Sequence, residues 1–145
     1  MTFSLFKYFD AILDGVEQNG LAALEQPEVK EALAELDSFL PPLSNVAKLV
    51  FSYHYVYQLK PQPLFISQLE KDLNVPTLYL EHEAARQELA QSDLLVRVME
   101  SEYLMPRNVI DAVATIDLEY YWPNRVIIAP EHKKEVFWRW IHDQK

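Results

Sequence analysis

Residues 63–89 read PLFISQLEKDLNVPTLYLEHEAARQEL, and the two helices that this stretch predicts decide the fold. Leu69 and Leu73 fall on one face of a short first helix, which Ser67 can cap. Asn74 follows at the position where a helix needs a residue that tolerates a left-handed backbone. The first half of the stretch therefore predicts a short helix that ends in a tight turn.

The second half of the stretch predicts a longer helix. Pro76 prevents the first helix from continuing, and Thr77 can cap the next one. Val75 lies in the turn and is expected to fill the angle between the two helices. The apolar face of the second helix carries Leu78, His82, Ala85 and Leu89. Two helices joined by a tight turn around a buried aliphatic residue are the framework of a helix-turn-helix unit.

This framework resembles the helix-turn-helix and winged-helix superfamily. The resemblance covers residues 63–98, in which residues 94–98 would be the first strand of a wing. The sequence departs from the family pattern at Glu70, where a small residue usually packs between the helices, and at Asn74, where glycine is usual. The resemblance implies that the second helix is the recognition helix.

The charge of the second helix favours a protein partner over DNA. A helix that enters the major groove presents cations to phosphates and hydrogen-bond donors to base edges. Here Arg86 is the only cation against three glutamates, and residues 66–107 hold four cations and eight anions. The candidate partner-binding residues on this helix are Tyr79, Glu81, Glu83 and Arg86.

The composition predicts a single compact domain over residues 1–145. Half of the residues are hydrophobic and only two are glycine, which argues against disorder and against a turn-rich β-sandwich. The fold class that follows is mainly α, a compact helical domain with a helix-turn-helix-like core and a small two- or three-stranded β element. The absence of cysteine excludes disulfides, thiolate zinc sites and cysteine nucleophiles.

The negative charge is concentrated at the N-terminal end of the chain. The formal net charge is −9, and residues 1–42 alone hold two cations and eight anions. This acidic N-terminal helical pair is expected to precede a core and C-terminal helices over residues 43–145. An acidic surface repels nucleic acid and membranes, so the expected partner is a basic protein.

Three helical segments are expected before the central stretch. The first spans residues 3–18, and the second runs from Pro27 to Leu40, where Pro41–Pro42 ends it. Residues 43–59 fit a helix that is buried on most sides, but the alternation of their aromatic residues also fits a strand. Their length and their position before the helix-turn-helix favour the helix.

The segment after the second helix leaves two readings open. Residues 94–105 have no clear period, and they predict either a two-stranded wing that turns at residues 100–102 or further helix. The sequence RVIIA at residues 125–129 is rich in β-branched residues and can pair with residues 95–99.

Two further helices are expected at the C-terminal end. One begins at Pro106 and ends at Trp122–Pro123, and the last spans residues 130–142. Trp138 lies off the apolar face of the last helix. It is either packed under the N-terminal helix or exposed as a contact for a partner, because large aromatic rings dominate interface energetics.

The sequence contains no pattern that points to catalysis. The histidines are His54, His82, His132 and His142, and only His132 has a glutamate three residues further on, which is most simply a salt bridge. No serine has the glycine-flanked turn of a nucleophile, and no glycine-rich loop can cradle a phosphate. Glu100 and Glu102 can face the same way on a strand, but such a pair needs a pocket. We therefore expect no enzyme, metal or cofactor.

Two functional hypotheses follow. The first is a non-enzymatic protein-binding domain, such as an inhibitor, an immunity protein or a small subunit of a larger complex. The alternative is a DNA-binding regulator that reads DNA with residues 77–88. A cytoplasmic location is expected because Lys7, Asp10 and Asp14 interrupt the apolar N-terminus and no run reaches the length of a membrane span. The sequence does not determine the oligomeric state.

Overall fold

A computed structural model describes residues 6–57, 64–65, 71, 78–99, 102–121 and 133–143. Its elements are α1 (Phe6–Asn19), the 3-10 helix η1 (Gly20–Glu25), α2 (Pro27–Leu36), α3 (Asn45–Tyr57), β1 (Leu64–Phe65), α5 (Leu78–Gln91), β2 (Val96–Met99), β3 (Glu102–Leu104), α6 (Arg107–Tyr121) and α7 (Lys133–Asp143). The protein is mainly α-helical with a small antiparallel sheet, which confirms the predicted fold class.

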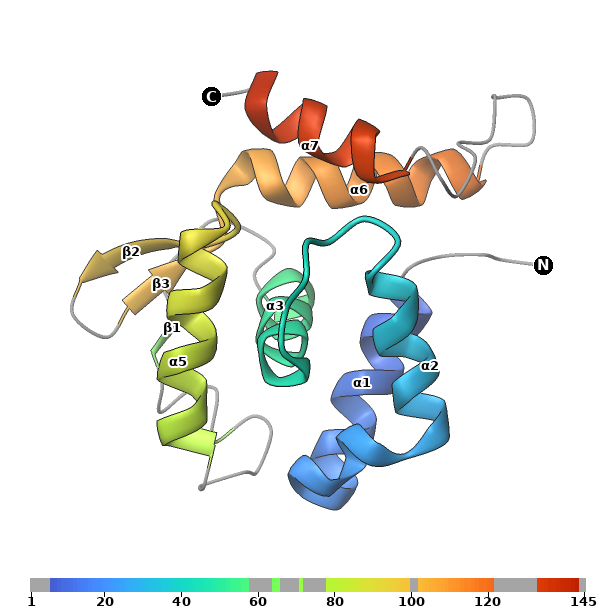
Figure 1. Ribbon diagram of the computed structural model, residues 1–145, viewed down its shortest axis with the longest axis vertical. Helices are drawn as coiled ribbons and strands as arrows, with labels where there is room; N and C mark the ends of the chain where they lie inside the picture. Colours follow the sequence, from blue (N-terminus) through green and yellow to red (C-terminus); the bar gives the residue numbers. More distant parts are fainter. Residues whose placement is uncertain are drawn as a thin grey trace.

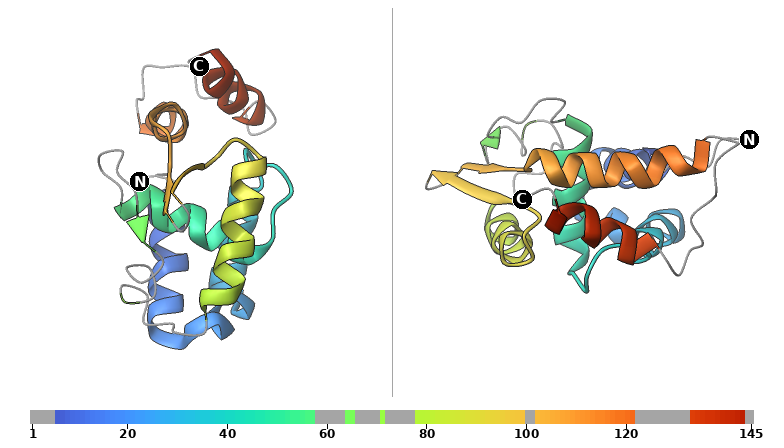
Figure 2. Two further views of the ribbon diagram at one scale, coloured as in Figure 1. Left: turned by 90° about the vertical axis from the view of Figure 1, so that its left-hand side faces the viewer. Right: turned by 90° about the horizontal axis from the view of Figure 1, so that it is seen from above.

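The helices are arranged around α3 (Figure 1). The pair α1 and α2 lies on one side of α3, and α5 with the sheet lies on the other. Helices α6 and α7 lie next to each other across one end of this body, as both views in Figure 2 also show. The molecule is therefore a three-part helical body with a second layer over one end.

Two helices, α1 and α2, form in the acidic N-terminal segment, and α2 ends at Leu36 rather than at the expected Leu40. Phe9, Ile12 and Val16 are completely buried along one face of α1. Pro27 is the first residue of α2, where its missing N–H has no consequence. Gly15 lies where the two helices meet, and a Cβ there would come within 2.8 Å of a Val29 methyl group. The close approach of α1 and α2 therefore depends on glycine at this position.

Residues 45–57 are helical, which settles the choice between helix and strand. Every residue from 47 to 54 is buried, so α3 is enclosed on all sides rather than along one stripe. Enclosure explains the ambiguous pattern, because a helix that is surrounded by other elements has no polar face to reveal its period. The alternating aromatic residues Phe51, Tyr53 and Tyr55 belong to this helix.

Val96–Met99 and Glu102–Leu104 form two antiparallel strands, so the two-stranded reading of this segment is confirmed and the helical reading is wrong. We call this pair of strands the wing. The sheet has the order β1–β3–β2, and both pairs are antiparallel. Tyr103 pairs with Leu64 on one side and with Arg97 on the other. The sequence analysis did not predict the strand at Leu64–Phe65, and the expected partner strand at 125–129 lies outside the described residues.

The central stretch is described in its second half. Helix α5 confirms the longer helix, and His82, Ala85 and Leu89 are buried as the spacing predicts. Asp93 then takes a positive φ of 64°, a conformation that aspartate tolerates better than most residues, and the chain turns into β2. The shorter first helix, expected at 67–73, falls outside the described residues apart from helical Lys71.

A chain of aromatic rings runs through the core and connects four parts of the molecule. The ring of Phe9 lies 5.1 Å from Tyr55 and 6.2 Å from Phe51, measured between centroids. Phe39, in the connection between α2 and α3, lies 6.5 Å from Phe51 and 5.0 Å from Phe137 on α7. Contacts of this kind add to the free energy of burial. Phe39 therefore joins the outer helical layer to the body.

Helices α6 and α7 pack against each other as well as against the body. Val109, Val113 and Ile116 of α6 are buried, which confirms the predicted core face of this helix. The side-chain amide of Asn108 donates a hydrogen bond of 3.1 Å to the backbone oxygen of Ile141 near the end of α7. This bond fixes the two helices relative to each other along their length.

Substitution of Phe39 tests the link between the two layers. We expect Phe39→Ala to lower the free energy of unfolding by about 3–5 kcal/mol, because it removes a completely buried ring and leaves a cavity. Denaturant titration followed by circular dichroism measures this change. Val98→Ala, at a half-exposed position, is the control and should change stability by less than about 0.5 kcal/mol. A loss below about 1 kcal/mol for Phe39→Ala would contradict the assigned role.

Candidate functional site

The exposed side chains among those described on α5 are uncharged, while Glu83 and Glu88 are half-buried. Ala84, Gln87 and Gln91 are exposed, and the side chain of Gln87 donates a weak hydrogen bond of 3.5 Å to Glu83. The structure does not describe the side chains of Tyr79 and Glu81, two of the candidate partner-binding residues.

Arg86, another candidate partner-binding residue, is completely buried, with 0% of its surface exposed. Its guanidinium lies over the ring of Tyr103, 5.0 Å from the centroid, and the Tyr103 hydroxyl donates a hydrogen bond of 3.3 Å to Glu83. Burial lowers the pKa of Arg86 to about 10, against an opposing effect of Glu83, so it remains charged at neutral pH. The structure thus places Arg86 beneath the surface rather than on it.

The burial of Arg86 leaves α5 without an exposed cation. Arg86 is the only lysine or arginine between Leu78 and Gln91, and the remaining basic side chain, His82, is buried as well. The sequence spacing could have predicted the burial of Arg86, because Arg86 follows two residues of the apolar face, His82 by four positions and Ala85 by one. It therefore belongs to the apolar face by position, even though its charge suggests the surface.

His82 is a neutral group in the core. Burial, followed by the charges of Arg86 and His54, lowers its pKa from 6.5 to about 2. Among the described residues, neither of its ring nitrogens has a hydrogen-bond partner. His54 is also completely buried, and its ring meets Tyr53 edge-on at 6.0 Å. The contact between α3 and α5 thus contains two histidines and an arginine.

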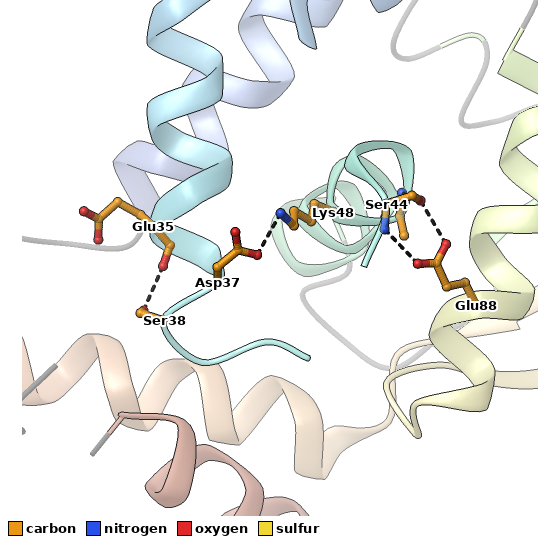
Figure 3. Close-up of polar contacts among 7 residues, drawn as sticks. Glu35, Asp37, Ser38, Ser44, Lys48 and Glu88 are labelled. Carbon is orange, nitrogen blue, oxygen red and sulfur yellow. Dashed lines mark hydrogen bonds and ion pairs between the residues drawn. The ribbon is translucent and has the colours of Figure 1, made fainter. Parts of the chain in front are cut away.

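Glu88 holds α5 to the beginning of α3 (Figure 3). One of its carboxylate oxygens accepts a hydrogen bond of 2.7 Å from the Ser44 backbone N–H, and the other accepts one of 2.9 Å from the Ser44 hydroxyl. The Ser44 hydroxyl oxygen also accepts a bond of 3.1 Å from the N–H of Ala47, so Ser44 caps α3. A carboxylate here also complements the positive end of the helix.

The wing carries the exposed apolar residues next to α5. Val96 and Val98 on β2 are 49% and 46% exposed, and Arg97 between them is exposed too. Figure 1 shows that β2 follows the C-terminal end of α5 and projects away from the body. We call the exposed residues of the two elements the α5–wing surface. Its members are Ala84, Gln87, Gln91, Val96, Arg97 and Val98.

Trp138, the last candidate partner-binding residue, is half-buried on α7. Its ring meets Phe137 edge-on at 5.4 Å and stacks on His142 at 5.8 Å. It packs partly against the core, on the helical layer that lies across the end of the body. The structure therefore does not bring Trp138 together with the candidates on α5.

An acidic surface lies on α1, η1 and α2, on the other side of α3 from α5 (Figure 1). Its exposed carboxylates are Asp14, Glu17, Glu25, Glu28 and Glu31. Asp10 is half-buried, and burial together with the neighbouring charge of Asp14 raises its pKa. Of the cations there, Lys30 forms an ion pair of 3.1 Å with Glu25. This end of the molecule is strongly negative.

The described residues hold no group of three or more histidines and carboxylates that could bind a metal ion. The candidate pair Glu100 and Glu102 is not tested, because Glu100 and the Glu102 side chain are outside the described part. Within the same limits, no helix is long and apolar enough to cross a membrane.

Comparison with known proteins gives no match: neither a protein-family model, nor a curated protein, nor a solved structure is significantly similar to this chain. The functional argument therefore depends on the residues of this protein alone.

The buried histidine predicts how stability depends on pH. The unfolded chain protonates His82 below about pH 6.5, whereas the folded protein does so only near pH 2. The contribution of His82 is therefore complete above pH 6.5 and is lost as the pH falls through the window from 6.5 toward 2. We expect a loss of about 2 kcal/mol between pH 7.5 and 5 from this residue.

The variant His82→Leu isolates this effect, because leucine fills similar space and does not titrate. Denaturant titrations at pH 7.5, 6.5, 5.5 and 5.0 measure the free energy of unfolding of both proteins. The variant should lose much less stability than the wild type over this range, and its stability at pH 7.5 should lie within about 1.5 kcal/mol of the wild-type value. Parallel pH profiles would show that His82 is not a neutral core group.

Proposed function

We propose that this protein is a non-enzymatic protein-binding domain, and that its partner contacts the α5–wing surface. In the segment that resembles a winged helix, residues 63–98, the helix that would read DNA serves a protein interface instead. The hairpin that follows α5 supports the family resemblance, because a winged helix carries its wing directly after the recognition helix.

The observation that carries the proposal is the burial of Arg86. A helix that binds DNA places cations against phosphates, and this electrostatic term supplies most of the non-specific affinity. The only cation of α5 is instead enclosed between α5 and Tyr103. Among its described side chains, α5 offers alanine and glutamine to solvent, with half-buried Glu83 and Glu88 beside them. Such a face suits a polypeptide better than a polyanion.

The wing adds apolar area to this interface. Half-exposed Val96 and Val98 are two of the large hydrophobic residues that the described part exposes, and they lie two residues apart on β2. A bulge between Arg97 and Met99 interrupts the pairing of β2 with β3 at this point, and Val96, Arg97 and Val98 are all exposed. Apolar side chains next to neutral polar ones are typical of the centre of a protein interface, where charged residues are depleted.

The charge of the whole molecule indicates a basic partner. The net charge of −9 and the exposed carboxylates on α1, η1 and α2 attract a positively charged protein over a distance. Such attraction raises the rate of association more than it slows dissociation. An inhibitor or an immunity protein of a basic enzyme, or a small subunit of a larger complex, fits this combination.

The variant Ala84→Arg tests the interface. It introduces a bulky charged side chain in the middle of the exposed α5 face, and we expect it to weaken binding of the natural partner at least tenfold. The partner is first isolated by affinity capture and identified by mass spectrometry, and its Kd is then measured with purified proteins.

Ala34→Arg is the matched control, because it makes the same change at an exposed helical position on α2. Its affinity should remain within about threefold of the wild-type value, and circular dichroism should show both variants folded. Equal losses in the two variants, or no loss in either, would contradict the assignment of the partner to the α5–wing surface.

A DNA-binding regulator is the second candidate, and the hairpin after α5 is the observation that favours it. Arg97 is exposed on the wing and is the residue that would contact a phosphate. The charge pattern of α5 leads us to expect no mobility shift of a mixed-sequence 30-base-pair duplex, at about 50 mM salt and protein up to about 10 µM. A shift that disappears with added salt and is reduced in Arg97→Ala would support the regulator and contradict our main proposal.

A further inference from the structure

A cavity of about 390 Å³ lies where the end of α2, the connection to α3, the beginning of α3 and the beginning of α7 meet. It is lined by Asp37, Leu40, Pro42, Leu43, Lys48 and Lys134. Its volume falls within the range of pockets that hold small molecules. The cavity is separate from the α5–wing surface, and nothing in the proposed function uses it.

Lys48 is the unusual member of this set, because only 6% of its surface is exposed. Its ammonium lies 2.7 Å from a carboxylate oxygen of Asp37, whose side chain is about half exposed. Figure 3 shows Lys48 extending from α3 toward the end of α2, while the Glu35 carboxylate points away from it. Asp37 thus fixes the position of a lysine that would otherwise move freely.

The second cation, Lys134, is exposed and comes from a different helix. It is the second residue of α7, so the cavity lies near the N-terminal turn of that helix. Lys48 is in the first turns of α3, whose N-terminal end also borders the cavity. The N-terminal end of α7 is positive because its first N–H groups have no partner within the helix, whereas Ser44 and Glu88 already compensate the N-terminal end of α3.

The charged groups of the lining are two lysines and one carboxylate, in a protein with a net charge of −9. Asp37 compensates Lys48, which leaves the charge of Lys134 in excess. Leu40, Pro42 and Leu43 provide the apolar part of the wall. A ligand that matches this lining has one anionic group and a small apolar body.

We propose that this cavity binds a small organic anion. A carboxylate or phosphate group lies between the ammonium groups of Lys48 and Lys134, and the apolar body packs against Leu40, Pro42 and Leu43. Because the ligand would contact α2, α3 and α7 together, its binding stabilises the fold. At a concentration of one hundred times Kd we expect the Tm to rise by about 5–10 °C.

The test uses four probes: benzoate, phenyl phosphate, inorganic phosphate and benzylamine. Binding to the full chain at pH 7 is measured by NMR chemical-shift titration and by thermal unfolding. We expect saturable binding of benzoate or phenyl phosphate, weaker binding of inorganic phosphate, which has no apolar body, and none of the cation benzylamine. Inorganic phosphate that binds as tightly as both organic anions would overturn the proposal, and so would tight binding of benzylamine.

Variants locate the site. Lys134→Glu should weaken the binding of the better organic anion at least tenfold, because an ammonium contact is replaced by a repulsive charge. Arg139→Glu makes the same change at an exposed position of α7 outside the lining, and it should keep the affinity within about twofold. Equal effects of the two variants would overturn the proposal.

Lys48→Met provides a second, independent variant. It removes the buried ammonium while keeping the length of the side chain, and binding should again weaken at least tenfold. Lys134 is exposed, so its substitution leaves the core intact. If Lys48→Met does not fold, the affinity measured for Lys134→Glu alone tests the proposal. The absence of saturable binding of both organic anions below about 20 mM would overturn the proposal outright.

Discussion

The enclosure of α3 is the constraint on which the rest of the structure depends. Eight consecutive residues, from 47 to 54, are buried, and they include Lys48, Ser52 and His54. A helix with no free face needs a partner on every side, since its apolar residues must leave water and its polar residues must find compensating groups. The pair α1 and α2 supplies Phe9 and Asp37, α5 supplies Glu88, and the connection to α3 supplies Phe39. The arrangement of the helices follows from these requirements.

The same requirement explains why α5 presents so little charge to solvent. Its contact with α3 and β3 takes in Arg86 and His82, so the exposed side chains among those described on α5 are alanine and glutamine, with Glu83 and Glu88 half-buried. Burial of a guanidinium is costly, and here the ring of Tyr103 and the carboxylate of Glu83 compensate part of that cost. A DNA-binding helix would use such a cation at its surface. Here Arg86 instead contacts Tyr103 and holds β3 against α5. The electrostatic and the structural arguments for a protein partner thus have one origin.

The sequence predicted the elements better than their contacts. Periodicity located α1, α2, α5 and α6, because each of these helices has one buried and one exposed face. It left α3 ambiguous, since burial on all sides removes the period, and it missed the two-residue strand β1, which is too short to show one. The charge of Arg86 suggests a surface residue, whereas its position four residues after buried His82 places it on the buried face. The contacts of Glu88 with Ser44 and of Lys48 with Asp37 join residues from different elements, and no local pattern encodes such pairs.

The beginning of α3 lies between the two proposed sites, and it is fixed from both sides. Ser44 faces α5 and binds Glu88, whereas Lys48, one helical turn further on, reaches the other way to Asp37 and the cavity (Figure 3). Residues in one helical turn move together, because the backbone hydrogen bond from the Lys48 N–H to the Ser44 oxygen joins them. The sites remain chemically distinct, since one offers apolar and uncharged polar side chains around a single cation, Arg97, and the other a pocket lined by two lysines and Asp37. An anion that binds Lys48 can therefore affect the α5–wing surface only by moving this helical turn. The two hydrogen bonds that Glu88 accepts from Ser44 oppose such a movement.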